Sequence, residues 1–95
     1  MNLIKYKWKY RILVLNTNCY QNKEYIKNRD LYYKYINDFK IRYVKLLANR
    51  KKGLKFCVNL FGFDGTLKLK SETLIPNNLF EIIDKMPMSK KVNVL

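Results

Sequence analysis

The segment at 55–70 places the strongest local constraint on how this chain folds, because two short runs rich in apolar residues flank the sequence Gly-Phe-Asp-Gly. The first run, KFCVNLF at 55–61, is mostly apolar, and the second, TLKLK at 66–70, alternates apolar and charged residues. An Asp-Gly pair between two such runs is among the strongest short-range signals for a β-hairpin. We therefore expect two antiparallel strands joined at Asp64 and Gly65.

The same segment partly matches the Asp-x-Asp-Gly-Thr signature of haloacid-dehalogenase-type phosphatases. In those enzymes the first Asp is the nucleophile, so it must carry a carboxylate. Gly62 occupies that position here, and only about 30 residues follow Asp64. This is too short for the remaining catalytic and metal-binding strands of that fold. The segment is therefore interpreted as a hairpin and not as a phosphoryl-transfer site.

The residues before the hairpin predict a strand, a helix and a second strand. Residues 5–17 alternate apolar and charged side chains and become apolar on both faces at 12–15, as a central strand does. Residues 18–39 change to a helical period, and residues 40–48 are again rich in apolar residues. A basic loop at 49–53 leads into the hairpin.

A second helix is predicted at 75–86, where Pro76 stands near the start and Pro87 follows the end. The element order is then β-α-β-β-β-α, and a right-handed crossover makes the first two strands parallel. We expect an α/β fold of the thioredoxin-like type, with a mixed four-stranded sheet and one helix on each face. Residues 1–90 form one domain in this interpretation, and 91–95 form a C-terminal tail.

Three stretches carry a family resemblance: WKYRILVL at 8–15, FCVNLFGFDGTLKLKSE at 56–72 and LFEIIDKMPMS at 79–89. They resemble a thioredoxin-like, peroxiredoxin-related domain of unknown function, which occurs in bacterial proteins and as repeats in a secreted vertebrate coiled-coil-domain protein. The resemblance spans about residues 6–90. It implies a thioredoxin-like fold and no particular activity.

Thiol chemistry of the thioredoxin type needs Cys-x-x-Cys at the start of the first helix. Cys19 lies near that place, but Asn22 stands where the second cysteine would be. Thr17 is two residues before Cys19, whereas peroxiredoxins place a Thr three residues before their reactive Cys. We therefore expect no enzyme activity, with Cys19 as the one weak catalytic candidate and Cys57 as a small buried apolar residue.

The composition excludes several other classes of site. Histidine is absent and only two cysteines are present, so we expect neither a metal nor a cofactor, and no disulfide framework. No run of 18 apolar residues exists, so no membrane-spanning segment is expected, although peripheral contact with a membrane complex is compatible with the sequence.

The charge balance is the clearest functional signal. The chain has 20 Lys and Arg against 7 Asp and Glu, and residues 1–55 hold 15 basic and 3 acidic side chains. Such a one-sided electrostatic field predicts an acidic partner. The residues expected to bind that partner are Lys5, Lys7, Lys9 and Arg11 on one strand face, Arg50, Lys51 and Lys52 in the basic loop, and Tyr25 and Tyr32 as exposed anchors on the first helix.

Three functions are compatible with these observations. The leading hypothesis is a non-catalytic basic adaptor or linker subunit that docks on acidic protein subunits of a large organellar complex. The second is an RNA-contacting subunit of an organellar ribosome, which would use the same cations against phosphates. The third is a thiol oxidoreductase or peroxidase acting through Cys19.

Residue usage suggests where such a complex is found. Phe, Tyr, Met, Ile, Asn and Lys, whose codons are AT-rich, total 51, whereas Gly, Ala, Arg and Pro total 10. This skew indicates an AT-rich genome. We expect an organelle-encoded protein on the stromal side of a plastid, with acidic antenna proteins of a photosynthetic complex as one partner class. The mitochondrial matrix is the alternative location, and an AT-rich nuclear genome or bacterium stays open.

Overall fold

The computed structural model describes residues 3–86, which form one mixed four-stranded open sheet with three α-helices. The elements in chain order are a 3-10 helix η1 (Ile4–Tyr6), β1 (Arg11–Thr17), α1 (Lys23–Lys34), α2 (Ile36–Ile41), β2 (Val44–Arg50), β3 (Cys57–Phe61), β4 (Leu67–Ser71) and α3 (Pro76–Asp84). The α/β class is confirmed, and the tail predicted at 91–95 lies outside the described residues.

The sheet has the strand order β2-β1-β3-β4. β1 and β2 are parallel, whereas the pairs β1–β3 and β3–β4 are antiparallel. The predicted parallel crossover and the predicted hairpin are therefore both confirmed. They leave β2 and β4 as the two edges of the sheet.

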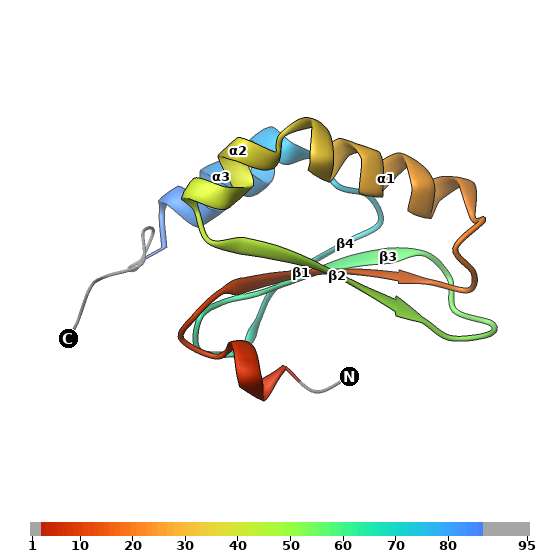
Figure 1. Cartoon of the computed structure of the whole chain (residues 1–95), viewed down its shortest axis with the longest axis horizontal. Coiled ribbons are helices and arrows are strands. Elements are labelled where there is room, and N and C mark those ends of the chain that lie inside the picture. The colour runs from red at the N-terminus through yellow and green to blue at the C-terminus, as the bar shows by residue number, and fades with distance from the viewer. Residues whose placement is uncertain (1–2, 87–95) are drawn as a thin grey trace.

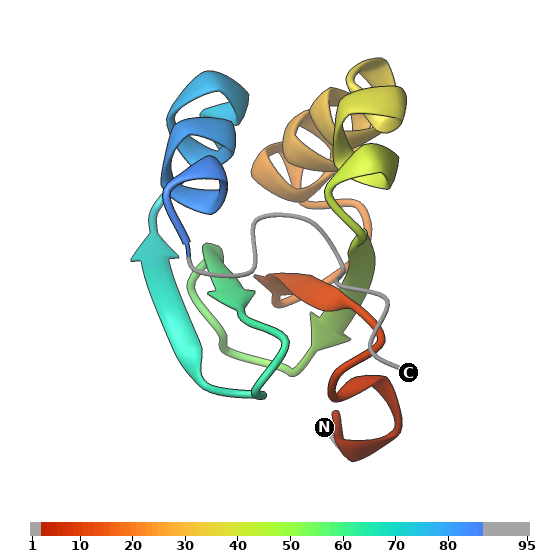
Figure 2. The ribbon, with the colours of Figure 1, turned by 90° about the vertical axis from the view of Figure 1, so that its left-hand side faces the viewer.

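All three helices lie on the same face of the sheet (Figures 1 and 2), so the prediction of one helix on each face is wrong. Side chains alternate along a strand, and each strand therefore offers one row to each face. The opposite rows include amides and lysines, which a helix packed there would remove from water at a cost. The rows that pack under the helices are apolar and consist of Leu13, Leu15, Val44, Leu46, Ala48, Val58, Leu60 and Leu69.

Aromatic rings join the three helices into one core. The ring of Tyr32 in α1 stacks on Phe39 in α2 with centroids 4.7 Å apart, and Phe39 meets Phe80 of α3 edge-on at 4.9 Å. Such pairs each stabilise the fold by roughly 0.5–1.5 kcal/mol beyond the area that they bury. The core therefore fills the space between the helix layer and one face of the sheet.

The strand predicted at 5–17 begins only at Arg11. Before it the chain turns back on itself, with the N–H groups of Lys9 and Tyr10 both donating to the carbonyl of Tyr6. Trp8 has a φ of 66°, and its N–H donates to the Phe63 carbonyl at 2.7 Å. A bulky residue at positive φ is strained, so this bond to the hairpin helps to hold the turn in place.

The helix predicted at 18–39 is divided into α1 and α2 at Tyr35. Asn22 is the N-cap of α1, because its side-chain oxygen accepts hydrogen bonds from the N–H groups of Glu24 and Tyr25 at 2.8 and 3.2 Å. The strand predicted at 40–48 starts later, at Val44, because Lys40 and Ile41 belong to α2. A residue at positive φ, Tyr43, makes the turn between them.

The hairpin closes at Gly65, which has a φ of 81° that favours glycine. Asp64 fixes the turn, because its Oδ1 accepts from the N–H of Thr66 at 3.0 Å and from the Thr66 hydroxyl at 2.8 Å. The Gly62 N–H donates to the Thr66 carbonyl at 3.0 Å. The Asp64 carboxylate therefore acts as a turn-forming acceptor.

One buried amide ties α1 to the segment that leads into α3. Asn28 is fully buried, and its Oδ1 accepts from the N–H of Leu74 at 2.7 Å and from the Thr73 hydroxyl at 3.2 Å. Its Nδ2 donates to the Glu24 carbonyl at 2.7 Å. A buried polar side chain with this set of partners positions the chain before α3.

We expect Asn28→Ala to lower the free energy of unfolding by about 1–3 kcal/mol, because the Leu74 N–H would be buried without an acceptor. Urea denaturation followed by circular dichroism measures this. Asn77→Ala is the matched control, since Asn77 is exposed on α3 and its loss is expected to change stability by less than about 0.5 kcal/mol. Equal effects of the two changes would contradict the assigned role of Asn28.

Candidate binding surface

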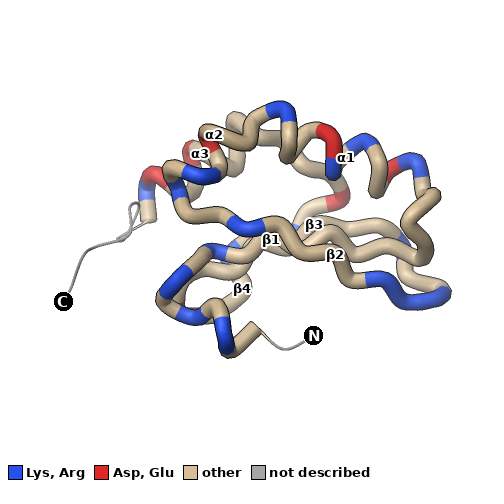
Figure 3. Tube along the Cα trace, viewed as in Figure 1, with Lys and Arg blue, Asp and Glu red and all other residues tan. Residues whose placement is uncertain are grey.

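Charge is unevenly divided between the two sides of the fold. The segments 23–42 and 76–86, which contain the helices, hold seven basic and five acidic residues. The segments 3–22 and 43–75, which contain the sheet and its loops, hold eleven basic and two acidic residues. Figure 3 shows the acidic positions mainly on the helix layer, whereas the charged positions on the strands and turns below it are mostly basic. The sheet side of the molecule is therefore strongly electropositive.

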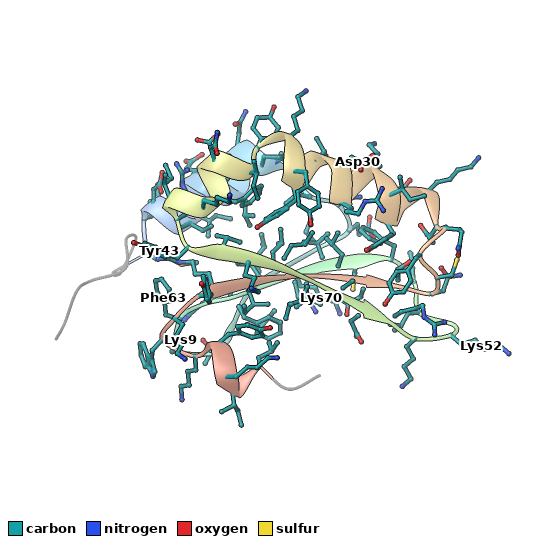
Figure 4. All side chains as sticks on the ribbon, in the orientation of Figure 1. Lys9, Asp30, Tyr43, Lys52, Phe63 and Lys70 are labelled. Atoms are coloured by element: carbon teal, nitrogen blue, oxygen red, sulfur yellow. The ribbon has the colours of Figure 1, made fainter. Side chains whose placement is uncertain are left out.

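The sheet face without helices, called the open face below, is a mixed apolar and polar surface. Lys45 and Lys70 project from it on the two edge strands, and Figure 4 shows Lys70 beneath the sheet, on the side opposite Asp30 of α1. The Lys45 Nζ lies 5.6 and 5.3 Å from the ring centroids of Tyr6 and Tyr10. By alternation and register, the open face carries Ile12, Val14, Asn16, Lys45, Leu47, Asn49, Cys57, Asn59, Phe61 and Lys70.

The cations predicted to bind a partner fall into two groups. Lys5, Lys7 and Lys9 belong to η1 and to the turn that precedes β1, so they do not share a strand face. Arg50 ends β2, and Lys51 and Lys52 follow it in the loop. Figure 4 shows Lys9 and Lys52 at opposite ends of the molecule, with Lys70 between them. The structure thus places these cations at both ends of the open face rather than in one compact patch.

Arg11 is not a surface cation, contrary to the sequence prediction. It is 1% exposed, its Nη1 donates to the Arg42 carbonyl at 2.8 Å, and its guanidinium carbon lies 4.3 Å from the Phe63 ring centroid. Burial lowers the pKa of Arg11, and the negative charge of Asp84 partly opposes this. Arg11 therefore has a structural role at the start of β1.

The two tyrosines predicted as exposed anchors are also buried, and that prediction is wrong. Tyr25 is 8% exposed and Tyr32 is 6% exposed. The Tyr32 hydroxyl donates to the Val44 carbonyl at 2.9 Å, which links α1 to β2. Burial raises the pKa of Tyr32 above its ordinary value. The helical stripe that contains them faces the core, so it offers no anchors to a partner.

A cleft of about 580 Å³ lies between η1 and the open face. Leu3, Ile4 and Lys7 line it from the η1 side, and Val14 and Phe61 line it from the sheet. Three amide side chains complete the sheet side: Asn16, Asn49 and Asn59. Clefts of this size that combine apolar walls with a few polar groups are typical of ligand sites.

The amides form a row across three strands. Asn49 donates through Nδ2 to the Asn16 Oδ1 at 2.9 Å. Asn16 donates in turn to the carbonyl and to the sulfur of Cys57, at 3.3 and 3.4 Å. Asn59 is different, because its Oδ1 is buried and accepts no hydrogen bond from residues 3–86. A buried acceptor without a donor is costly, so a rotation of the Asn59 amide that brings this oxygen into the cleft would let a ligand N–H or O–H satisfy it.

Among residues 3–86, Asp64 is the one acidic residue that lines this cleft. Its carboxylate is already occupied by the N–H and hydroxyl of Thr66 and by Lys68, whose Nζ lies 3.2 Å away. Hydrogen bonds from Thr66, followed by those from Lys68, lower the pKa of Asp64 to about 2. Asp64 therefore stays charged at neutral pH and belongs to the turn.

The turn between η1 and β1 carries an exposed tryptophan. Trp8 is 54% exposed and lines a smaller hollow of about 230 Å³ together with Phe63 and Met86. Lys68 also lines this hollow. Exposed tryptophans beside apolar hollows are frequent anchors in protein interfaces.

The two cysteines lie on different elements and neither is in a disulfide. Cys19 is half-buried in the loop between β1 and α1, where its carbonyl accepts from the Thr17 hydroxyl at 2.8 Å. Cys57 is half-buried on β3 and not fully buried as predicted. Within residues 3–86 no group of three Cys, Asp or Glu side chains could hold a metal ion. No helix in that part of the chain is long and apolar enough to cross a membrane.

Comparisons with known proteins found no matching family model, no matching curated protein and no matching solved structure. The fold and the surface described above are therefore the basis for a functional proposal.

Asn16, Asn49 and Asn59 were not singled out from the sequence. A signal was nevertheless present, because asparagine is depleted in strands and Asn59 interrupts an otherwise apolar run at 56–61. Asn16 likewise follows four apolar residues of the central strand. The register between β1 and β2 could not be predicted from the sequence. It brings Asn16 opposite Asn49 and so places these amides together.

We expect the Asp64 carboxyl to titrate with a midpoint near pH 2, below its usual value of 3.8. Because this pKa is lowered by folding, the charged carboxylate stabilises the hairpin above about pH 4, and that contribution is lost as the pH falls toward 2. Carbon-detected NMR titration of the side chain measures the midpoint. Thr66→Val removes the hydroxyl donor and should raise the midpoint; an unchanged midpoint would contradict the assigned cause.

Proposed function

We propose that this chain is a non-catalytic RNA-contacting subunit of a larger assembly, which binds phosphates through the open face and the cations at its two ends. The observation that supports this most is the division of charge: apart from the buried Arg11, the sheet side of the described chain carries ten exposed basic residues against two acidic ones. One of those two acids, Asp64, is paired with Lys68. A polyanion laid across this side would therefore meet almost only positive charge.

The shape of the surface also favours an extended polyanion. Lys9 and Lys52 lie at opposite ends, and Lys70 lies between them beneath the sheet (Figure 4). A strand of RNA that follows the open face can contact such separated cations in sequence, as single strands do in basic grooves. Lysines suffice for this contact, because they bind phosphate as point charges.

The second candidate is an adaptor that docks on an acidic protein, and exposed Trp8 is the observation that favours it. A tryptophan beside a hollow lined by Phe63 and Met86 could serve as the central anchor, with Lys68 beside it in the same hollow. In this candidate, acidic subunits of a plastid assembly would be the partners, a location inferred from residue usage alone. Tyr25 and Tyr32 have no part in it, because both are buried.

We also propose that the fold is thioredoxin-like and related to the peroxiredoxin-like domain named above. The support is the chain order, in which a parallel β-α-β unit is followed by an antiparallel hairpin and a final helix. The loop after β1 carries only Cys19, because Asn22 is the helix cap. In this proposal the domain has kept the sheet and has no thiol chemistry.

The RNA proposal is tested by the binding of a labelled ten-nucleotide RNA, measured by fluorescence anisotropy across a salt series. The double variant Lys45→Glu/Lys70→Glu should weaken binding on the order of tenfold or more and make the salt dependence shallower, because two phosphate contacts are lost. Lys27→Glu/Lys34→Glu is the matched control, since it makes the same change in net charge on exposed positions of α1.

An equal loss in both double variants would contradict a localised surface and indicate attraction by net charge alone. Tight binding of polyglutamate with no measurable RNA binding at low salt would overturn the RNA proposal and favour the adaptor. In that case Trp8→Ala should weaken the binding of an acidic protein partner on the order of tenfold, as the loss of an interface anchor does.

A further inference from the structure

We propose that the cleft between η1 and the open face binds one unpaired nucleobase of an RNA strand. This rests on the proposed function, because the strand is brought to the surface by the same cations. The cleft adds a preference for single strands, which the cations alone do not provide.

The walls of the cleft suit a flat, partly polar group. Val14 and Phe61 form an apolar part of the sheet side, and Leu3 and Ile4 cover it from the η1 side. The volume of about 580 Å³ exceeds what one base needs and leaves room for its sugar. Apolar and aromatic walls on both sides are the usual means by which proteins hold an unstacked base.

The amides supply hydrogen bonds that match the edge of a base. Asn59 lines the cleft, and its Oδ1 is buried without a donor from the described residues; a rotation of the amide that brings this oxygen into the cleft would let it take an N–H from a base. Asn49 lies nearby in the same wall, and its donation to Asn16 at 2.9 Å orients its amide. Asparagine amides carry one acceptor and two donors, so they can bond to either kind of group on a base edge.

The charges around the cleft suit the phosphates of the same strand. Lys7 lines the cleft itself, and Lys45 and Lys70 lie on the edge strands beside it. The Asp64 carboxylate also lines the cleft, but Lys68 pairs with it at 3.2 Å and the Thr66 hydroxyl donates to it. The base would therefore enter between an apolar wall and a largely positive rim.

Other occupants fit less well. A second copy of this chain carries the same net charge of +13, so two open faces would repel each other. An acidic peptide satisfies the lysines and offers backbone N–H donors, but its Asp and Glu side chains have no flat apolar surface to pack on the wall formed by Val14 and Phe61. Duplex RNA keeps its bases paired and stacked, and so cannot present one to a cleft.

The central experiment compares a ten-nucleotide single-stranded RNA with a ribose-phosphate decamer of equal length that lacks bases, and with a duplex. We expect the single strand to bind on the order of tenfold more tightly than the decamer without bases, because one held base contributes that much. Equal affinity of these two strands at the same salt concentration would overturn the inference.

Two variants locate the effect. Asn59→Leu and Asn49→Leu keep side-chain size and suit a strand, and each should remove most of the difference between the two decamers while leaving the salt dependence unchanged. Asn77→Leu on the exposed side of α3 is the matched control and should preserve the difference. A preserved difference in folded Asn59→Leu protein would overturn the inference.

A measurement on the unmodified protein avoids any effect of the substitutions on folding. In NMR titrations the side-chain amide signals of Asn49 and Asn59 should shift with the single strand and stay in place with the decamer without bases. Signals that respond equally to both would contradict a base in the cleft. If neither strand binds at low salt, the proposed function fails, whereas binding of both strands without amide shifts refutes the cleft inference alone.

Discussion

The central strand β1 has two rows of side chains that differ in kind, and the rest of the architecture depends on this difference. All seven of its residues are buried. Leu13 and Leu15 continue into apolar rows on the neighbouring strands, so that face can be covered by helices. On the other face Asn16 and the lysines of β2 and β4 interrupt the apolar surface. Every α-helix therefore packs on one side, and the other side carries no α-helix.

This one-sided packing also divides the chemistry of the molecule. The helix layer carries acidic and basic residues in similar numbers, and some are paired, as in the bidentate contact of Arg42 with Asp84 at 2.9 and 3.0 Å. In the described segments that contain the sheet and its loops, the acidic residues are Asp64 and Glu72 alone, and Figure 3 shows mostly basic charged positions there. Recognition of a polyanion can then be separated from the helix packing that stabilises the fold, because the two tasks use opposite faces of the same sheet.

Much of the fold could be predicted from the sequence, since the Asp64-Gly65 turn and the β-α-β order act locally. The side of the sheet that each helix covers could not be predicted. A helical stripe identifies the apolar side chains but not the surface that they contact. The alternation at 5–11 was also ambiguous, since it continues through a 3-10 helix and a turn. Arg11 was misassigned because a charged residue is usually exposed, whereas here ring and carbonyl contacts accommodate it. The grouping of the three cleft asparagines could not be predicted either, because it depends on the register between paired strands.

The positive charge on the two edge strands of the sheet also affects how copies of the protein can associate. Within residues 3–86, β2 and β4 each have an unpaired edge, which could add a strand from another molecule. Lys45 and Arg50 on one edge strand, and Lys68 and Lys70 on the other, discourage such pairing through mutual repulsion. A polyanion that neutralises these residues would remove that protection at the moment of binding. Under the proposed function, free protein and RNA-bound protein would therefore differ in their tendency to assemble edge to edge, and the lysines that bind RNA would also be those that keep the free edges apart.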